Sequence, residues 1–410
     1  MLVAFGKYLK ILRDRRNMSL SDVVTLTKSY PEPVGKGYLS RVERGLARVG
    51  FSKMVALSRA YEVSLDALGE KLALDLEVEA LKNAPNTSGK TFGELTDEGA
   101  AFSERGMRWH CYACMRDALA RAASDPLYRG NGSQREQVTR SALSHGIAAR
   151  ATGRYLLALS ELEFVLQNLE GLNPDRVSIV FEQSASVRLR LGELEEARVL
   201  AERAIEAARG SSLQANLGDA LSTRAIVAYH ANDMTSAIAG HQEAFAIYRA
   251  IGRQAECART MNNLAQCYFD VRRLRAARRA LGAADRLATA MGADAVRARS
   301  RILLGEIELL EGNAKKASRH WHDAMEIARR THDSVVHFKA EFQVFKLSIS
   351  QGNLTAANAL GRRLNRMTPW IPRSEPEVVE FVRLYALHRK PKQRGVAKSQ
   401  LEYPASGNPQ

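Results

Sequence analysis

Cysteine is scarce in this chain, and no stretch of it stays apolar for long. Four cysteines in 410 residues are too few for a disulfide framework, which excludes the small, disulfide-stapled classes of secreted protein. No run approaches the ~20 consecutive apolar residues that a membrane-spanning helix needs. Basic residues interrupt the apolar ones in residues 1–16, and no small-residue cleavage site follows, so no signal peptide is expected. We therefore expect a cytoplasmic protein that does not bind membranes.

Motifs for catalysis and cofactor binding are also missing. The chain contains no P-loop, no GxGxxG fingerprint, no HExxH metal motif and no GxSxG nucleophile elbow. His320 and His322 point apart on a helix, so they hold a metal only with a third ligand from elsewhere. The sequence favours a binding protein over an enzyme, and we expect no cofactor.

The four cysteines do not have the spacing of a zinc site. Cys111 and Cys114 lie one helical turn apart after His110, which invites a zinc or redox interpretation. A structural zinc site needs four ligands, however, and Cys257 and Cys267 do not form a second spaced pair. We expect ordinary packed or partly exposed cysteines and no metal site.

Positive charge, by contrast, is abundant. The net charge is +15, of which residues 1–72 carry +6 (13 Lys and Arg against 7 Asp and Glu) and residues 389–410 carry +4 (5 against 1). A small basic terminal domain suits a polyanionic partner, because each neutralised phosphate releases counterions. The basic tail 389–410 is expected to be disordered, and it either adds nonspecific DNA affinity or only improves solubility.

Helical periodicity runs throughout the chain, and no alternating run predicts a strand, so we expect an all-α fold. Residues 71–82 look like a further helix or an extended arm, and 83–90 is the clearest linker. Before them, the apolar spacing and the capping residues predict five short helices: Phe5–Arg16, Leu20–Thr27 with Ser19 as N-cap, Lys36–Arg44, a Ser52-capped helix through Tyr61, and a Ser64-capped helix around Leu65–Leu68.

The remainder repeats itself with a spacing of 39 or 40 residues. Six interhelical turns fall at Gly153, Gly192, Asn232, Arg272, Gly312 and Gly352. An alanine follows each turn by five residues, at Ala158, Ala197, Ala237, Ala277, Ala317 and Ala357. Mostly small residues also stand seven before and twelve after each turn. Small residues at fixed offsets allow two antiparallel helices to cross closely, so the pattern predicts a stack of helical hairpins.

This repeat resembles the tetratricopeptide repeat (TPR) over residues ~134–366, with about six extra residues per unit from longer helices or longer loops. The resemblance implies an α-solenoid. We expect a first domain at 1–72, a connecting helix or linker at 73–97, and a repeat domain at 98–388. Within the repeat domain, 98–123 would form one flanking helix and Glu377–His388 a terminal cap.

The N-terminal segment resembles the Cro/repressor-type (XRE) helix-turn-helix family over residues 5–70, at GYLSRVERG (Gly37–Gly45) and YEVSLDAL (Tyr61–Leu68). The resemblance implies a structural pair between Arg13 and Glu43. It also places Lys36, Gly37 and Arg41 toward the bases and Arg44 where phosphate contacts are usual. Ser40 on the same helix and Lys28 before it are expected as further DNA contacts.

Two features depart from that family. The turn before the recognition helix (SYPEPVGKG) is about five residues longer, and Leu20 replaces a polar residue that usually contacts phosphate. The long turn either touches the DNA backbone through Lys28 or Ser29 or shifts the recognition helix. The alternative to DNA reading is a helix-turn-helix bundle that is kept only for protein contacts.

The first helices of TPR hairpins line a concave groove that commonly takes peptides or partner helices. The inward offsets predict these groove residues: Asp219, Ser222, Tyr229, Arg259, Asn262, Gln266, Phe269, Arg299, Lys339, Gln343 and Lys346. The tandem of domains resembles the peptide-pheromone regulators of Gram-positive bacteria, which implies a peptide effector. A protein contact, self-association or a plain solvated face are the alternatives.

Taken together, the sequence predicts a transcriptional regulator that binds double-stranded DNA. It is expected to be a homodimer, because such domains usually read two half-sites. The main alternative is a scaffold or regulator of a signalling partner, with the N-terminal bundle as a docking module. A phosphatase acting on response regulators is a third alternative, for which no residue can be assigned.

Overall fold

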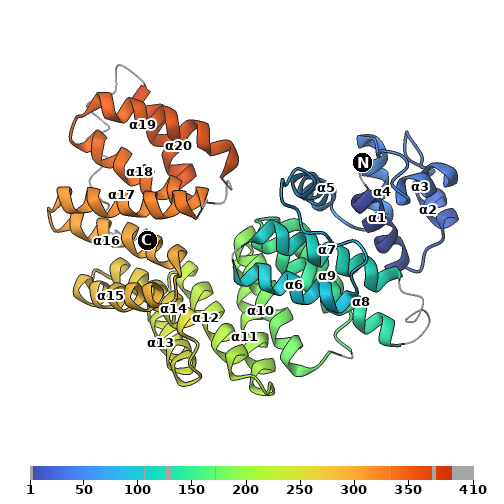
Figure 1. Cartoon of the computed structure of the whole chain (residues 1–410), viewed down its shortest axis with the longest axis horizontal. Coiled ribbons are helices and arrows are strands. Elements are labelled where there is room, and N and C mark those ends of the chain that lie inside the picture. Colours follow the sequence, from blue (N-terminus) through green and yellow to red (C-terminus); the bar gives the residue numbers. More distant parts are fainter. Residues whose placement is uncertain are drawn as a thin grey trace. The chain divides into compact units, whose positions relative to one another are not determined.

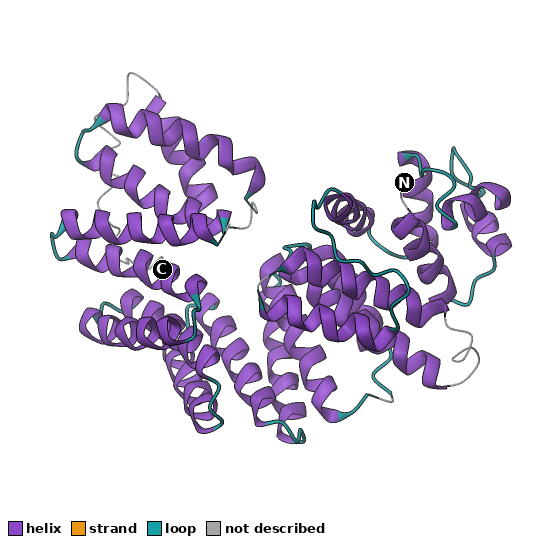
Figure 2. Ribbon diagram, viewed as in Figure 1, coloured by secondary structure: helices purple, strands orange, loops and turns teal. Residues whose placement is uncertain are grey.

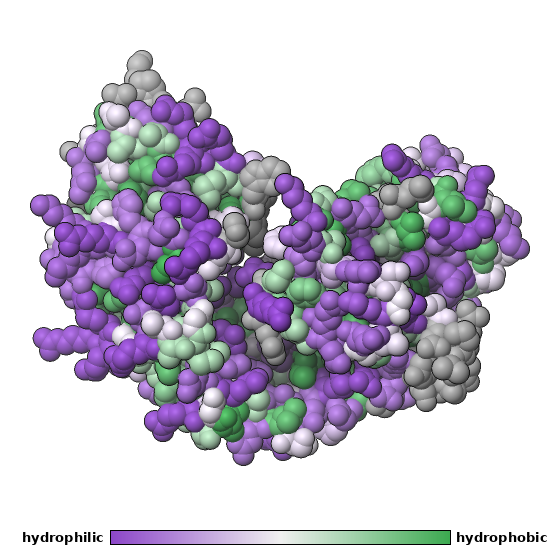
Figure 3. All heavy atoms as spheres, viewed as in Figure 1, coloured by the Kyte–Doolittle hydropathy of each residue, from purple (hydrophilic) through white to green (hydrophobic). Residues whose placement is uncertain are grey.

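The computed structural model describes residues 3–105, 107–124, 132–170, 172–331, 333–371 and 375–389. Over these residues the chain is all-α and contains no strand, as the sequence predicts (Figure 2). The surface in Figure 3 is largely hydrophilic, with scattered apolar residues, and none of the described helices is long and apolar enough to cross a bilayer. The basic tail lies outside the described residues, apart from Arg389 at the end of the last helix. The chain divides into two compact units, Met1–Ser212 and Leu213–Gln410.

The first unit opens with five helices around one apolar core (Figure 1), in which Leu9, Val23, Leu39 and Leu57 are fully buried. Ser19 caps the second helix in a capping box with Asp22, as expected. The five helices are α1 (Val3–Arg15), α2 (Leu20–Thr27), α3 (Lys36–Glu43), α4 (Phe51–Ala60) and α5 (Leu65–Glu79).

Several helix boundaries differ from the prediction. Both ends of α1 and the C-terminal end of α3 shift by one or two residues, and α4 and α5 also differ. Gly50, and not Ser52, is the N-cap of α4, so the helix begins two residues earlier than expected and has no side-chain cap. The Ser64-capped helix does not stop near Leu68 but continues to Glu79, across the expected domain boundary at residue 72. Tertiary burial explains the extension, because Leu74 and Val78 in its second half are buried.

Three antiparallel hairpins complete the first unit: α6 (Phe92–Glu104) with α7 (Arg108–Ser124), α8 (Gly132–Ala151) with α9 (Tyr155–Leu166), and α10 (Pro174–Leu191) with α11 (Leu194–Arg209). The single flanking helix expected at 98–123 is wrong, since a break after Arg105 divides this region into a hairpin. The capping box of Thr91 and Glu94 at the start of α6 was the available sequence signal.

The second unit is itself built from an almost regular repeat of helical hairpins. The first helix of each hairpin begins at residue 214, 254, 294 or 334, a spacing of 40. From α12 to α18 each helix is 17 residues long, so the extra length relative to the TPR consensus lies in the helices. The helices are α12 (Gln214–His230), α13 (Met234–Ala250), α14 (Gln254–Asp270), α15 (Leu274–Ala290), α16 (Asp294–Leu310), α17 (Ala314–Arg330), α18 (Ser334–Ser350), α19 (Leu354–Met367), a 3₁₀ turn (Thr368–Trp370) and α20 (Pro376–Arg389).

The six turns predicted from the sequence share one backbone conformation. All six turn residues have positive φ, including the two that are not glycine, Asn232 at 61° and Arg272 at 59°. A single left-handed residue ends each first helix and reverses the chain into the second. The six alanines that follow each turn by five residues are completely buried. Each therefore lies inside the packed interface of its hairpin, where only a small side chain fits.

In the hairpin of α16 and α17, a glycine on one helix faces a tryptophan on the other. Gly305 occupies the small position on α16, and a Cβ there would lie 2.3 Å from Nε1 of Trp321 on α17. Trp321 is fully buried and donates its indole N–H to the Ile302 carbonyl at 3.1 Å. The hairpin thus preserves its crossing distance by pairing the largest side chain with glycine.

Candidate nucleic-acid interface and repeat face

The predicted recognition helix is α3, and its two faces have opposite character. Leu39 and Val42 are buried in the core of the domain. Lys36, Gly37 and Arg41 lie exposed on the other face. The first and second residues of α3 belong to this exposed face, so the helix presents its N-terminal end to solvent, as a major-groove reader must.

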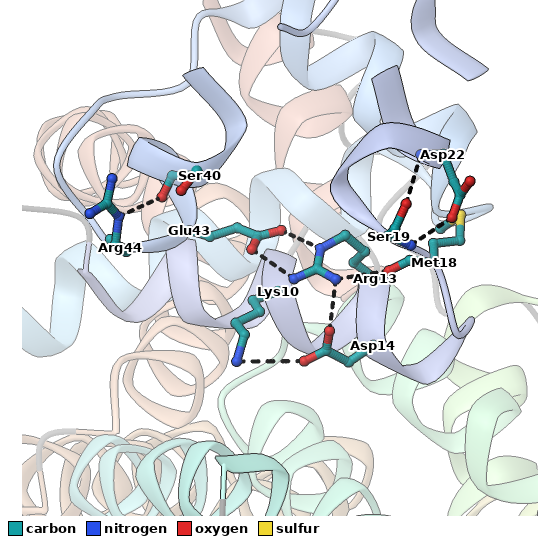
Figure 4. A network of polar contacts seen from close by, with 9 residues as sticks. All are labelled: Lys10, Arg13, Asp14, Met18, Ser19, Asp22, Ser40, Glu43 and Arg44. Atoms are coloured by element: carbon teal, nitrogen blue, oxygen red, sulfur yellow. Dashed lines mark hydrogen bonds and ion pairs between the residues drawn. The ribbon is translucent and has the colours of Figure 1, made fainter. Parts of the chain in front are cut away.

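The remaining predicted DNA contacts flank this face. Arg44 is exposed and donates from Nε to the backbone carbonyl of Ser40 at 3.1 Å (Figure 4). Ser40 itself is half-buried, and Lys28 is exposed at the end of α2. The local hydrogen bond orients the Arg44 guanidinium along the surface of α3, and its remaining N–H groups are available to an external acceptor.

Arg13 and Glu43 form the ion pair that ties α3 to α1. Arg13 donates from Nε and Nη2 to the two carboxylate oxygens of Glu43 at 2.7 and 2.9 Å, and from Nη1 to the Met18 carbonyl at 2.8 Å (Figure 4). The Glu43 hydrogen bonds hold the pKa of Arg13 above its ordinary value. A bidentate pair of this kind fixes orientation as well as distance, so α3 is rigidly placed on the domain.

Helices α1 and α3 also pack backbone against backbone, at a position where α1 has a glycine. A Cβ on Gly6 of α1 would lie 2.1 Å from the carbonyl oxygen of Val42 on α3. Gly45, which ends α3 with φ of 74°, packs against Val3 in the same way, with 2.8 Å to its Cα. Both contacts lie at the C-terminal end of α3, where its backbone packs directly against the first turns of α1.

The long turn before α3 is anchored to the domain. Val34 in this turn is fully buried, and its N–H donates to Oγ1 of Thr27 at 3.2 Å. Glu32 pairs with Lys53 of α4 at 3.3 Å. Leu20, the other departure from the family pattern, packs against the core as a half-buried side chain. The extra residues thus extend the turn outward while both of its ends stay attached to the helices.

A buried ionic network joins this domain to the first hairpins. Glu161 of α9 is completely buried and accepts hydrogen bonds from the Tyr8 hydroxyl at 2.7 Å and from Arg15 at 2.8 Å. Nδ1 of His145 on α8 lies 3.7 Å away. Burial by itself would raise the pKa of Glu161, but Arg15 and then His145 hold it well below its ordinary range. Glu161 is therefore ionised, with its charge balanced by a residue of α1.

Helix α5 supplies the second half of the same contact. Lys71 forms a buried ion pair with Asp75, which also accepts from the Tyr112 hydroxyl at 3.4 Å. Glu70 accepts a hydrogen bond from the Leu157 N–H in the first turn of α9 at 2.8 Å. Because α9 has no side-chain cap of its own, Glu70 satisfies an amide that the helix end would leave unpaired.

The sequence interpretation missed all of these docking residues. A usable signal existed, since Lys71 and Asp75 stand four residues apart on an otherwise apolar helix face with Leu68, Leu74 and Val78. Charged residues at core positions are retained only where they are paired, so they mark a contact with another element.

Most of the predicted groove residues form hydrogen bonds or ion pairs with residues outside the predicted set. Gln266 donates to Asp270 at 3.2 Å, and Asp270 also accepts from the Tyr229 hydroxyl at 2.8 Å. The other hydrogen bonds and ion pairs of the predicted set join Ser300 to Asn262 at 3.0 Å, Gln343 to Glu306 at 2.9 Å, Tyr248 to Asp219 at 2.6 Å, Lys339 to Glu375 at 2.8 Å and Glu377 at 3.1 Å, and Lys346 to Glu380 at 3.5 Å.

Four predicted groove positions remain. Ser222 is half-buried and Arg299 is exposed, while exposed Arg259 reaches Glu256 on its own helix at 3.3 Å. Phe269 is not a groove residue, because it is 7% exposed and packs in an apolar cluster with Leu281 and Ile307. Its ring fills the space between hairpins that the small crossing residues leave open.

Glu306 has the most perturbed carboxyl group of this face. Burial raises its pKa to about 7, and Lys346 partly opposes that rise. Three neighbouring carboxylates raise the pKa further: Glu377, Asp270 and Glu380. Near neutral pH the group is therefore close to half-protonated, and its charge state responds to any ion placed beside it.

We expect Glu306→Gln to stabilise the protein at pH 8 by about 1–3 kcal/mol and to have no effect at pH 5. The folded-state pKa of about 7 exceeds the ordinary value of 4.5, so the folded state holds an extra proton between these values. Wild-type stability therefore rises as the pH falls through this window, and the glutamine variant lacks that rise. Urea unfolding of both proteins at pH 5 and 8 measures the difference.

The matched control for this comparison is Glu326→Gln, whose side chain is 69% exposed and is not among the carboxylates that act on Glu306. It should leave the pH dependence within a few tenths of a kcal/mol of the wild type. Equal pH profiles for Glu306→Gln and the wild type would contradict the raised pKa.

The four cysteines are buried and free. Burial raises the pKa of Cys111, and it raises the pKa of Cys114 to about 12, so both thiols are protonated at neutral pH. A protonated, buried thiol is a poor nucleophile and a poor metal ligand. Among the described residues, no group of three or more His, Cys, Asp or Glu side chains has the arrangement of a metal site.

Comparison with known proteins agrees with this architecture. Residues 4–70 match the family described as a helix-turn-helix domain. No curated protein matches the chain significantly. A Rap protein solved in complex with Competence and Sporulation Factor is 14% identical, with a TM-score of 0.60, and the match covers 76% of this chain and 85% of that one. The apo form of RapI is 11% identical, with a TM-score of 0.53, over 68% of this chain and 99% of that one.

A third structure, PlcR of Bacillus thuringiensis in complex with the peptide PapR7 and DNA, is 13% identical with a TM-score of 0.44, over 73% of this chain and 99% of that one. The two matches above a TM-score of 0.5 establish the fold of the repeats. The chain therefore consists of a helix-turn-helix domain at residues 4–70 followed by TPR-like repeats that share the fold of the Rap proteins.

Proposed function

We propose that this protein is a sequence-specific, DNA-binding transcriptional regulator of the XRE type. The observation that carries the proposal is the exposed N-terminal end of α3, with Lys36 and Arg41 free of the core, on a helix that Arg13 and Glu43 fix to α1. Arg41 can make two hydrogen bonds to guanine O6 and N7 in the major groove. Rigid placement matters because misplacing such a donor by an ångström loses both bonds.

Arg41→Ala tests this function directly. We expect selective binding to the protein's target fragment to weaken by about 1–3 kcal/mol, a factor of roughly 5 to 150, while weak binding to unrelated DNA persists. The measurement is fluorescence anisotropy with genomic fragments, beginning with the DNA upstream of the gene, across 50–300 mM salt as tested conditions.

The control is Arg59→Ala, which removes one exposed positive charge from α4 of the same domain and leaves α3 untouched. It should retain selective binding. If Arg41→Ala and Arg59→Ala behave alike and the wild type shows no sequence preference, the helix-turn-helix domain is a docking module and the protein is a scaffold or regulator of a signalling partner.

We further propose that the repeats serve the regulator as an effector-binding and dimerisation domain, without enzymatic activity. Support comes from the regular hairpin stack and from the polar face that runs through Gln266, Glu306 and Gln343. Such a face can exchange its internal hydrogen bonds for those of an extended peptide or a partner helix. The Rap protein of the same fold was solved with Competence and Sporulation Factor.

A further inference from the structure

Positive charge outside the helix-turn-helix domain is concentrated in one part of the repeats. Residues 272–330 contain 14 Lys and Arg against 7 Asp and Glu, a net +7. The whole of 73–388 carries +5, since +6 lies before it and +4 after it in a total of +15. The rest of the repeats therefore has a net −2. This concentration falls on the two hairpins that contain α15 and α17.

The fold places these cations outward on two successive helices. The opposite faces of α15 and α17 are buried through alanines such as Ala277, Ala284, Ala317 and Ala324. Eight cations of these two helices are exposed, of which Arg329 and Arg330 form ion pairs. We call the other six the α15–α17 basic surface: Arg275, Arg279, Arg286, Lys315, Lys316 and Arg319. In Figure 3, hydrophilic side chains project over these helices.

Four of the six form a regular array. Arg275 and Arg279 lie one helical turn apart on α15, and Lys315 and Arg319 lie one turn apart on α17. Each residue of the second pair follows its counterpart by 40 residues, which is the repeat length, so the two pairs occupy equivalent positions of successive hairpins. The array presents charges about 6 Å apart along each helix.

Carboxylates in this region neutralise other cations. Glu308 and Glu311 pair with Arg278 at 2.7 and 2.6 Å, and Asp285 pairs with Arg301 at 3.3 Å. Within the described part of the chain, none of the six cations of the basic surface forms an ion pair. Like charges one turn apart repel each other, and an external polyanion would remove that repulsion.

The composition of the surface distinguishes between two kinds of polyanion. Protein interfaces contain an apolar centre with aromatic or aliphatic anchors. Several large apolar side chains are exposed in the part of the chain that the structure describes, but none of them lies within α15 or α17. Nucleic-acid interfaces are more polar and more positively charged, and arginine suits phosphate through paired hydrogen bonds. We propose that the α15–α17 basic surface binds the phosphate backbone of double-stranded DNA, independently of base sequence.

The test uses the full-length protein with Arg275→Gln, Arg279→Gln, Lys315→Gln and Arg319→Gln combined. Its control combines Arg121→Gln, Arg190→Gln, Arg209→Gln and Arg366→Gln, four exposed arginines scattered over other helices, so that both variants lose the same charge. Binding to a 40-bp duplex of arbitrary sequence is measured by anisotropy from 50 to 300 mM salt. Each phosphate contact contributes about 0.9 to the slope of log K against log salt.

We expect the slope of the first variant to be smaller than that of the wild type by about 2–4, and the slope of the control to change by less than 1. Equal losses in both variants, or no loss in the first, would overturn the proposal. The proposal would also be overturned if poly-glutamate competed for binding as well as unlabelled DNA at the same concentration of charge. That result would indicate an acidic protein partner. Because the duplex contains no operator, the outcome does not depend on whether α3 reads bases.

Discussion

Gly6→Ala is expected to unfold the helix-turn-helix domain or to lower its stability by about 3 kcal/mol or more. Glycine to alanine inside a helix ordinarily stabilises by up to about 1 kcal/mol, because alanine has the higher helix propensity. Here the added Cβ would lie 2.1 Å from the Val42 carbonyl oxygen, and the Val42 and Glu43 carbonyl carbons would lie at 3.2 and 3.3 Å. Backbone atoms cannot move aside as the end of a flexible side chain can, so α1 and α3 would have to separate.

Separation of these helices would also break the Arg13–Glu43 pair and displace α3. We therefore expect selective DNA binding to be lost together with stability. Thermal unfolding by circular dichroism and anisotropy with the target fragment measure the two effects. Gly69→Ala on α5 is the control, because no atom lies within 4 Å of its added Cβ. An unchanged melting temperature for Gly6→Ala would show that α1 and α3 approach less closely than described here.

Glu161→Gln is expected to release the helix-turn-helix domain from the first hairpins, at a cost of about 3–5 kcal/mol. The substitution leaves Arg15, whose side chain is 6% exposed, without a counter-charge in a buried site. It also weakens the bond from the Tyr8 hydroxyl, since an amide oxygen is a poorer acceptor than a carboxylate. An unpaired buried charge is costly because neither water nor a partner solvates it.

The expected signature is faster hydrogen exchange in α1 and α5, with exchange in α14 to α18 unchanged. Glu163→Gln, on the same helix α9, is the matched control. Its carboxylate pairs with Arg188 at 2.7 Å but is 46% exposed, so its loss should cost less than about 1 kcal/mol. If α1 and α5 exchange as slowly in Glu161→Gln as in Glu163→Gln, apolar packing alone holds the domain in place.

The acid dependence of this contact follows from the depressed pKa of Glu161. Burial opposes ionisation, but Arg15 and His145 outweigh it and keep the folded-state pKa below the unfolded one. The stabilisation is then fully present above the unfolded pKa of 4.5 and is lost as the pH falls through the folded value. The domain contact is accordingly built to persist throughout the neutral range.

Much of this architecture could be predicted from the sequence because it depends on local geometry. The six turns at Gly153, Gly192, Asn232, Arg272, Gly312 and Gly352 could be placed from spacing alone, since one left-handed residue ends each first helix. The alanines five residues later could be read as crossing points because a fully buried site at the crossing of two helices admits only a small side chain. The exposed positions of α3 were predicted differently, from the resemblance of the block Gly37–Gly45 to the helix-turn-helix family.

Residues that act between elements could not be predicted in this way. Nothing in local spacing shows that Glu161 meets Tyr8 and Arg15, which lie about 150 positions earlier in the chain. The groove pattern predicted Gln343 by periodicity, but it gave no sign that this side chain is buried or that its partner is Glu306. A helical pattern records which face of a helix is buried, whereas the identity of the facing residue depends on how the hairpins stack.

The sequence by itself determined the helical class and the phase of the repeats, because both follow from the 3.6-residue period and from one backbone conformation per turn. The surface of α3 was predicted from the family resemblance of Gly37–Gly45. Only the tertiary structure decided which charges are neutralised. It buried Glu161 and Lys71 between the first domain and the repeats, and it left Arg275, Arg279, Lys315 and Arg319 exposed. The physical reason is that ionic contacts depend on distances of a few ångströms between elements that are remote in sequence.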